Sequence, residues 1–352
     1  MSSRPNLPNQ APTELLPATE FLLGSTARPH SASAKQDCIS CGGDRTREFI
    51  AASDRFFARS NVYRLLQCES CSLVWLADPP EVSEMDRHYG PSYDQFIRKA
   101  TDKESERHWR RAVDTVQRYS QGGRLLDLGC GSGSFLHCLR GGAWTLWGIE
   151  MSAAAAELAR TRNHATILTD DVLQAPFPPE VFDVITCFHV FEHMTSPREV
   201  LAKVKEWLKP GGIFCVHVPN INAAEKRLFR SYWYPLELPR HLFHFSPRSL
   251  RQLAQANGLE EVSVTTAKVS FVEYSTRYLV DEALRKAGVP RPALAEAGDP
   301  PLPWRVVRKG LRLTALPVLN WLIGLTGEGS IIEAVFRKPE PDAARQQHKA
   351  SR

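Results

Sequence analysis

Residues 125–136 constrain the fold more than any other part of the chain, and they read Leu-Leu-Asp-Leu-Gly-Cys-Gly-Ser-Gly-Ser-Phe-Leu. The leading apolar residues suit a buried parallel strand, the alternating glycines suit a tight turn, and Phe135 and Leu136 open a helix. Because glycine has no Cβ, such a loop lets a ligand approach the backbone and the amides of the helix N-terminus. We therefore expect a ligand crevice here, with Asp127 facing it.

The glycine spacing separates two kinds of ligand loop. Dinucleotide-binding loops have the spacing Gly-x-Gly-x-x-Gly, whereas Gly129, Gly131 and Gly133 give Gly-x-Gly-x-Gly. With an acid just before the glycines, the stretch resembles the first motif of the class I S-adenosylmethionine-dependent methyltransferases. The resemblance implies that the loop lies against the methionine part of the cofactor and that Asp127 helps to hold its amino group.

Residues 144–150 form an apolar stretch that ends in an acid, Glu150. A carboxylate at the end of a second parallel strand can accept both hydroxyls of a ribose, and the position matches the second motif of the same family. We assign Glu150 and the adjacent Met151 to cofactor binding. The alternative is an acid that favours the N-terminus of the following helix, and the two roles are compatible.

The next two strands carry the remaining cofactor candidates. Residues 165–172 end in two acids, and in the family the acid at the position of Asp171 bonds the adenine amino group while the amide of Val172 serves the ring. Asp170 can instead cap a turn. Phe188 ends the fourth strand, an apolar stretch typical of a strand buried on both faces, and completes the cofactor set.

Residues 189–194, His-Val-Phe-Glu-His-Met, follow the fourth strand where the transferred methyl group is expected. Glu192 and His193 match the Glu-His pair of a group that includes the ubiquinone-biosynthesis O-methyltransferases. Those enzymes usually carry a further Glu at the position of His189, and their acidic set is linked to a divalent metal. Two histidines and one carboxylate can also bind a metal, but we favour helix-capping and packing roles for them.

Residues 219–246 leave the carboxyl end of the fifth strand and should form a lid over the site, with aromatic walls and cationic groups that suit an anionic acceptor. Within it, Pro-Arg-His-x-x-His-Phe-Ser resembles a stretch of bacterial methyltransferases associated with sugars and cell-surface glycans. We take His193, His241 and His189 as catalytic candidates, because neutral imidazole can accept the proton of a hydroxyl acceptor. The alternative for His241 is a structural bond to the backbone.

Two thiol pairs near the N-terminus predict a metal site. Four thiolates from two knuckles give zinc a closed tetrahedral shell, which suits a structural rather than a catalytic metal. Unrelated cysteines or a redox pair are the alternatives. The four expected zinc ligands are Cys38, Cys41, Cys68 and Cys71.

Strands alternating with helices predict an α/β fold: a doubly wound, seven-stranded, mostly parallel sheet of the Rossmann-like methyltransferase type, with a small N-terminal zinc ribbon. The family resemblance places the last strand, 331–337, antiparallel beside the sixth. The expected divisions are a disordered arm (1–34), a zinc ribbon (35–80), a helical cap (81–120), a methyltransferase domain (121–338) with a lid (219–246) and an insertion (268–329), and a loose tail (339–352).

The composition bears mainly on the partners. A net charge of +5 in 352 residues is too small to indicate nucleic acid, and neither a dense Lys/Arg run nor the Asp/Asn-Pro-Pro-Tyr/Phe run of base-methylating enzymes is present. No apolar run has the length of a membrane span, so we expect a cytoplasmic protein. Within the insertion, the basic and then apolar residues 304–325 fit a peripheral membrane contact, a substrate lid or helices covering the domain, and we favour the last.

These features together predict an S-adenosylmethionine-dependent methyltransferase that acts on a small-molecule acceptor, most simply a hydroxyl of a sugar, glycan or lipid-linked intermediate. The zinc ribbon keeps a nucleotide-sugar C-methyltransferase and an RNA methyltransferase as alternatives. A cofactor- and zinc-binding interaction protein without turnover is the alternative from another class. The sequence does not set the oligomeric state.

Overall fold

A computed structural model describes residues 37–89, 102–289, 309–310 and 313–341. The arm at 1–34, Tyr93 and Phe96 of the helical cap, residues 290–308 of the insertion and the tail from 342 onward lie outside the described residues. Sequence-based expectations for those segments stay predictions.

A seven-stranded sheet forms the centre of the molecule, in the order β10-β11-β8-β7-β4-β5-β6. The strands β4 to β8 pair in parallel, whereas β11 is antiparallel to both β10 and β8. This mostly parallel, doubly wound arrangement confirms the predicted fold class. The strands are β4 (Gly123–Leu128), β5 (Trp144–Ile149), β6 (Thr166–Leu168), β7 (Phe182–Phe188), β8 (Leu208–Pro219), β10 (Glu260–Ala267) and β11 (Ile331–Arg337).

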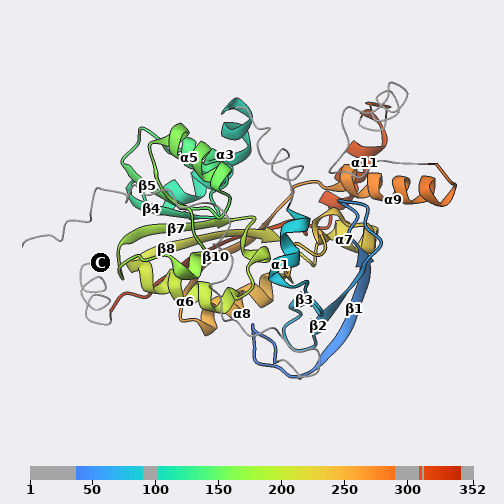
Figure 1. The fold of residues 1–352 in the computed structure, drawn as a ribbon, viewed down its shortest axis with the longest axis horizontal. Helices are drawn as coiled ribbons and strands as arrows, with labels where there is room; N and C mark the ends of the chain where they lie inside the picture. Colours follow the sequence, from blue (N-terminus) through green and yellow to red (C-terminus); the bar gives the residue numbers. More distant parts are fainter. Residues whose placement is uncertain (1–36, 90–101, 290–308, 311–312, 342–352) are drawn as a thin grey trace, which may run out of the picture.

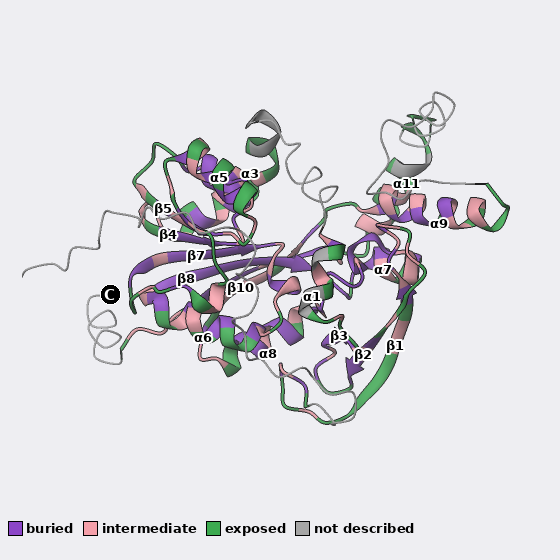
Figure 2. Ribbon diagram, viewed as in Figure 1, coloured by how far each residue is buried: buried purple, intermediate pink, exposed green. Residues whose placement is uncertain are grey.

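Side chains alternate between the two faces of this sheet, as the pleat of a strand requires. Leu125 packs into the core on the face of α3 (Asp102–Tyr119) and α5 (Ala153–Asn163), and Leu126 into the core on the face of α6 (Pro197–Trp207) and α8 (Pro247–Ala256). Figure 1 shows these helices on opposite sides of the sheet, and Figure 2 shows the strands between them buried. Both faces are covered, which explains why β7 is apolar nearly throughout.

Two strands differ in length from the stretches that the sequence suggests. β8 starts at Leu208 rather than near residue 213, because the Gly211 amide donates to the Lys338 carbonyl and the Lys338 amide donates to the Gly212 carbonyl. The backbone beyond β11 therefore extends the pairing through the glycines. β6 has only three residues, since it lies at the sheet edge and Asp171 already accepts a hydrogen bond from the Leu173 amide in the following turn.

Serine side chains cap the N-termini of α5 and α8. Ser152 Oγ accepts from the Ala155 amide at the start of α5, and Ser246 with Ser249 forms a capping box at the start of α8. Such caps satisfy amides that have no partner within the helix. The short helix α4 (Ser134–His137) follows the glycine loop with Gly133 as its cap residue.

The N-terminal residues form a second sheet, in the order β1-β2-β3-β9. β1 (Thr46–Ser53), β2 (Val62–Cys68) and β3 (Val74–Leu76) come from the N-terminal segment, whereas β9 (Phe243–His244) belongs to the lid. We call residues 37–89 the N-terminal module; it also contains α1 (Val82–Met85) and η1 (Asp86–His88). Its sheet is therefore completed by a strand from the methyltransferase part of the chain.

We keep the names lid and insertion for residues 219–246 and 268–329, which carry further helices. The lid carries α7 (Ala224–Phe229), η4 (Arg230–Tyr232) and η5 (Tyr234–Leu236), and the insertion carries α9 (Val272–Lys286) and α11 (Ala315–Gly324). Figure 1 shows α9 and α11 beside α7, away from the seven-stranded sheet. Among the described residues, no helix is both long enough and apolar enough to cross a membrane.

Candidate active site and metal centre

The glycine loop after β4 lies close to the side chains of Val190 and Asn163. Gly129 has φ +68°, and a Cβ built on it would lie 2.6 Å from the Val190 side chain. Gly133 has φ +72°, and a Cβ there would lie 2.1 Å from Asn163 Nδ2. Both the positive φ and the close contacts require glycine, so these residues shape a loop whose backbone a ligand can approach.

Asp127 lies at the end of β4 and is 4% exposed. Thr186 Oγ1 donates to Asp127 Oδ1 at 2.7 Å. Burial raises the pKa of Asp127 to about 7, and the neighbouring Glu150 adds to the shift, while the bond from Thr186 opposes it. Burial disfavours the charged form of this carboxyl group, and a cation bound beside it would stabilise that form again. The site therefore favours a cationic partner.

Glu150 follows β5 and binds two backbone amides. The Gly131 amide donates to Oε2 and the Ser152 amide donates to Oε1, both at 2.8 Å. The carboxylate thus fixes the middle of the glycine loop and the start of α5 at once. The role at the N-terminus of the following helix, one of the two that the sequence suggests for Glu150, is therefore present.

The other adenosine-side candidates lie at the ends of β5 and β6, which are neighbours in the sheet. Met151 is 69% exposed. Asp171 is exposed and its Oδ1 accepts from the Leu173 amide at 2.7 Å, while Asp170 Oδ1 accepts from the Asp171 amide at 2.8 Å. Val172 begins η2 (Val172–Gln174) and is half-buried. Both acids therefore act locally as turn caps.

Phe188 ends β7 inside an aromatic group contributed by four elements. Its ring centroid lies 4.9 Å from Phe135 of α4, 5.7 Å from Trp109 of α3 and 4.3 Å from His217 of β8. Trp109 and Phe135 are themselves 5.6 Å apart. The group forms an apolar wall at the carboxyl ends of β7 and β8.

His189 adopts φ +58° directly after β7, and its amide donates to the His217 carbonyl at 2.9 Å. Burial lowers the pKa of His189 to about 4 and that of His217 to about 3. Both imidazoles are therefore neutral near pH 7. Sequence reasoning missed His217, although its place at the carboxyl end of a parallel strand is the signal that could have found it.

His193 and His241 face each other, with ring centroids 4.5 Å apart. His193 Nδ1 lies 3.1 Å from the Arg240 carbonyl oxygen, and His241 Nδ1 lies 2.9 Å from the Pro235 carbonyl oxygen. Because a carbonyl oxygen only accepts, both contacts place the proton on Nδ1 and leave the Nε2 lone pair basic. Burial lowers the pKa of His193 to about 4 and that of His241 well below its usual value.

Two further groups complete the surroundings of this pair. Tyr89 Oη lies 3.0 Å from His193 Nδ1, a contact across 104 residues of sequence that no motif predicts. Glu192 is 1% exposed, its Oε1 lies 3.9 Å from His241 Nε2, and burial raises its pKa to about 8. The arrangement can accept a proton at a histidine beside a carboxyl group that is itself largely protonated.

Potential metal ligands also meet here. Glu192, His193 and His241 offer ligand atoms that all lie within 4.8 Å of one another. The sequence suggests a set with His189, whereas the cluster among the described residues contains His241 from the lid instead. The reason is the backbone turn at His189, whose ring faces His217 at 6.3 Å.

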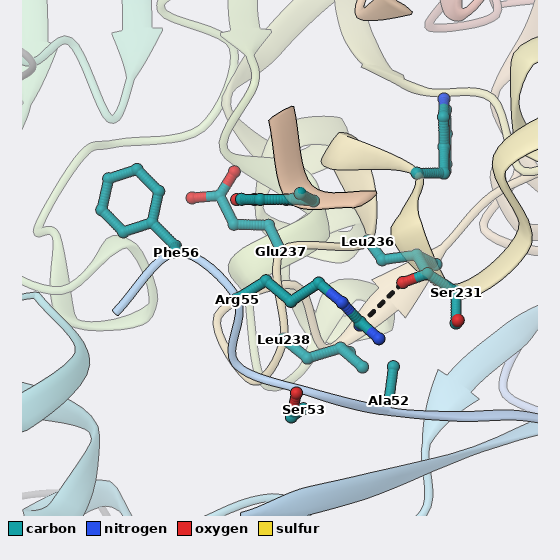
Figure 3. Close-up of a pocket in the computed structure, with 10 residues that line it drawn as sticks. Ala52, Ser53, Arg55, Phe56, Ser231, Leu236, Glu237 and Leu238 are labelled. Carbon is teal, nitrogen blue, oxygen red and sulfur yellow. Dashed lines mark hydrogen bonds between the residues drawn. The ribbon is translucent and has the colours of Figure 1, made fainter. Parts of the chain in front are cut away.

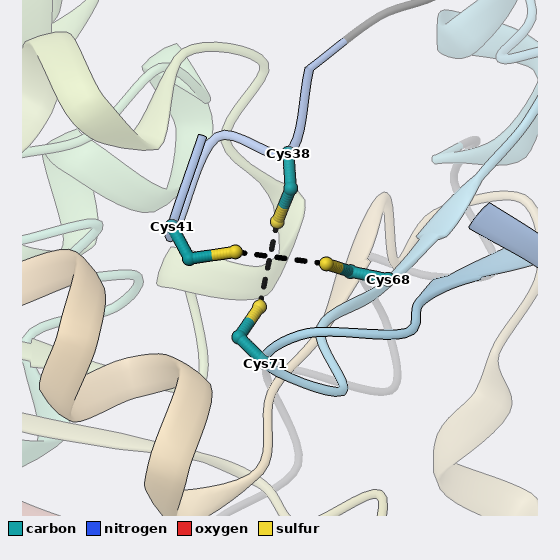
Figure 4. Close-up of side chains that lie close together, drawn as sticks. All are labelled: Cys38, Cys41, Cys68 and Cys71. Atoms are coloured by element: carbon teal, nitrogen blue, oxygen red, sulfur yellow. Dashed lines mark hydrogen bonds between the residues drawn. The ribbon is translucent and has the colours of Figure 1, made fainter. Parts of the chain in front are cut away.

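The four N-terminal cysteines lie together, as Figure 4 shows, with their sulfur atoms pointing to a common centre. Cys38 Sγ lies 3.4 Å from Cys71 Sγ, and Cys41 Sγ lies 3.6 Å from Cys68 Sγ. A tetrahedral zinc with Zn–S bonds of about 2.3 Å requires sulfur atoms about 3.8 Å apart. The cluster therefore fits zinc, and a shell of four thiolates leaves no position for a substrate.

Comparisons with known proteins assign the family. A family profile described as a methyltransferase domain matches residues 102–264. A ubiquinone biosynthesis O-methyltransferase of Thiobacillus denitrificans is 30% identical over 158 residues, which cover 41% of this chain and 67% of that protein. The protein of the same name from Coxiella burnetii is 27% identical over 149 residues, covering 38% and 57%. The chain thus spans about half to two thirds of the length of the curated relatives it matches.

The similar solved structures have low sequence identity to this chain. Phosphoethanolamine N-methyltransferase 2 of Haemonchus contortus, in complex with S-adenosylmethionine, has a TM-score of 0.49 and 16% identity, with 73% of this chain and 60% of that one covered. Similarity at this level does not bear on the acceptor. The family match and the first relative do establish the class: the chain belongs to the S-adenosylmethionine-dependent methyltransferases.

Proposed function

We propose that this methyltransferase transfers the methyl group to a hydroxyl of a small sugar, glycan or lipid-linked acceptor, with His193 and His241 as the groups that receive the proton. The observation that carries the proposal is the facing pair of neutral imidazoles, each with Nδ1 bonded to a carbonyl oxygen. A hydroxyl oxygen must lose its proton as it forms the new bond, so it needs a base nearby. A neutral amine can attack through its lone pair without first losing a proton.

The cofactor side follows from the residues around the glycine loop. S-adenosylmethionine supplies an electrophilic methyl carbon on a sulfonium centre. In this proposal the buried carboxyl group of Asp127 holds the cationic amino group, Glu150 at the end of β5 binds the ribose hydroxyls, and Asp171 and Val172 at the end of β6 bind the adenine. Phe188 and its aromatic neighbours exclude water from the reacting centre, which strengthens polar contacts there.

Two cations of the lid have partners within the protein. The lid cations suggest an anionic acceptor, yet Lys226 lies over the Phe49 ring at 3.7 Å and Arg227 pairs with Glu328. Burial also lowers the pKa of Lys226 to about 8. Two of these cations are thus engaged within the protein, so we base the acceptor class on proton transfer rather than on charge.

The test incubates purified protein and methyl-labelled S-adenosylmethionine with fractionated cell extract. We expect label in a sugar, glycan or lipid pool, and a fall in kcat on the order of 10²-fold for His193→Gln or His241→Gln with the cofactor Kd unchanged. Asp127→Ala should instead weaken cofactor binding. Label in RNA, or in a carbon position of a nucleotide sugar, would overturn the acceptor class. Cofactor binding without transfer to any pool would favour an interaction protein.

A further inference from the structure

The lid segment that carries His241 is held between the N-terminal module and the loop after β7. Val74 and Trp75 of β3 pair with His244 and Phe243 of β9, and the Leu76 amide donates to the Leu242 carbonyl at 2.9 Å. On the other side, the Leu242 amide donates to the Glu192 carbonyl at 2.8 Å. The lid backbone therefore cannot move without disturbing the module.

A buried carboxylate of the module lies behind this segment. Asp54 follows β1 and is 0% exposed. Its Oδ1 accepts from the Phe57 amide at 3.1 Å, and its Oδ2 lies 3.2 Å from His88 Nδ1 and 3.5 Å from Arg240 Nη1. Arg240 is also 0% exposed, and its guanidinium lies over the Phe56 ring at 4.7 Å. The module thus surrounds the cation of the lid.

Arg240 reaches both catalytic candidates from this position. Its Nε donates to Glu237 Oε1 at 3.1 Å, and Glu237 Oε2 lies 3.6 Å from His241 Nε2. Its carbonyl oxygen accepts from His193 Nδ1 at 3.1 Å. Arg240 therefore contacts His193 through its own carbonyl oxygen and is linked to His241 through the Glu237 carboxylate.

The loop after β1 contacts the lid at a second place. Figure 3 shows Arg55 beside Ser231, with Phe56 and Glu237 at the edge of the same hollow. Arg55 Nη1 donates to the Ser231 carbonyl at 2.8 Å, and its guanidinium lies over the Tyr232 ring at 4.2 Å. The loop that carries Asp54 is therefore fixed relative to the lid.

A cation with no exposed surface depends on its anionic partners, because it has lost its hydration. Among the described residues, the carboxylates of Asp54 and Glu237 form ion pairs with the Arg240 guanidinium. Loss of the Asp54 charge would leave more of the neutralisation of Arg240 to Glu237, and the carboxylate beside His241 would be drawn away from the imidazole. Even a small displacement of this carboxylate and of His241 matters, since misplacing a reacting group by about 1 Å can lower the rate by about 10²-fold.

We propose that Asp54 is a positioning residue for methyl transfer: through Arg240 and Glu237 it fixes His193 and His241, so that the N-terminal module completes the active site. The proposal rests on the proposed function, because it takes these two histidines as the proton acceptors. Asp54 contacts Phe57, His88 and Arg240, so it would act on the two histidines through Arg240 and Glu237.

The test compares Asp54→Asn with Asp78→Asn, a matched loss of one carboxylate in the same module. Asp78 is exposed and pairs with Arg64. We expect Asp54→Asn to lower kcat at least tenfold with the cofactor Kd unchanged, and Asp78→Asn to leave kcat unchanged. In an Arg240→Gln background, Asp54→Asn should change kcat less than twofold, since the link is already broken. Equal kcat values for the two Asn variants, or multiplicative losses in the double variant, would overturn the proposal.

An NMR measurement that needs no methyl acceptor distinguishes failure of this proposal from failure of the proposed function. In protein labelled with ¹⁵N at histidine, Asp54→Asn should shift the ring nitrogen resonances of His193 and His241, and Asp78→Asn should not. Unchanged resonances overturn the positioning role. If Asp54→Asn shifts the resonances but the single variant His193→Gln keeps full methyl transfer, the proposed function fails and the positioning role of Asp54 stands. If Asp54→Asn does not fold, Arg240→Lys, which keeps the charge, must shift the same resonances.

Discussion

At the scale of single residues, burial sets the chemistry of this site more than charge partners do. Asp127, Glu192, His193 and His217 all have pKa values moved toward the neutral form, and desolvation is the largest cause for each. A site of neutral groups accepts a cationic cofactor and a neutral hydroxyl without strong repulsion. Burial keeps the imidazoles of His193 and His217 unprotonated near pH 7, as a proton acceptor requires.

Asp127 gives the clearest consequence for stability. The folded-state pKa of about 7 lies above the ordinary value of 3.8, so the folded chain holds a proton that the unfolded chain has lost between about pH 4 and 7. The free energy of unfolding therefore falls as the pH rises through this window. Asp127→Asn removes the effect, which is on the order of a few kcal/mol.

We expect Asp127→Asn to raise the Tm relative to wild type at pH 8 and to change it little at pH 4, measured by calorimetry without cofactor. The same variant should bind S-adenosylmethionine more weakly, because the amide carries no charge for the amino group. A Tm difference that is equal at both pH values would contradict the buried, protonated state of Asp127.

At the scale of elements, local patterns predicted the strands and helices of the fold, and the family resemblance correctly placed β11 antiparallel beside β10, but the contacts between the N-terminal module and the lid were not predicted. Short stretches of sequence predict the glycine loop, the strand before Glu150 and the strand that ends at Phe188. The pairing of β3 with β9 joins residues about 170 positions apart, and a two-residue strand has no periodicity to detect. Tyr89 and Asp54 reach the site through such contacts, so sequence reasoning could not place them.

The loop between β4 and α4 allows a matched test of glycine geometry. Gly129→Ala places a Cβ 2.6 Å from the Val190 side chain at φ +68°, whereas Gly141→Ala at φ +76° meets nothing within 4 Å. The left-handed conformation alone costs about 1–2 kcal/mol, and only Gly129→Ala adds a clash. Denaturant unfolding should therefore show the larger loss for Gly129→Ala, together with weaker cofactor binding by titration calorimetry.

Val190→Ala provides the control for this comparison. It removes the two methyl groups that the new Cβ would meet, so it should recover part of the stability lost in Gly129→Ala and none of that lost in Gly141→Ala. Equal losses for the two alanine variants would mean that the loop can move away from Val190 at little cost.

At the scale of the whole molecule, the N-terminal module and the methyltransferase part share one core. Cys38, Cys68 and Cys71 belong to the same hydrophobic cluster as Phe245 and Leu250. Ser40 Oγ donates to the Ser249 carbonyl at 2.7 Å, and Arg198 Nη2 donates to the Ile39 carbonyl at 2.7 Å. The segment that carries the four cysteines is thus packed on α6 and α8.

This shared core predicts a single unfolding transition that depends on the metal. Removing zinc with a chelator, or Cys41→Ser, opens a thiolate shell that lies against the main core, and structural zinc supplies folding free energy directly. Calorimetry should show one transition that moves to lower temperature, with weaker transfer at temperatures where the chain stays folded. Cys138→Ser, outside the cluster, is the control. A separate low-temperature transition that leaves the main one in place would show that the module unfolds by itself, and the lid would then keep its histidines in place without it.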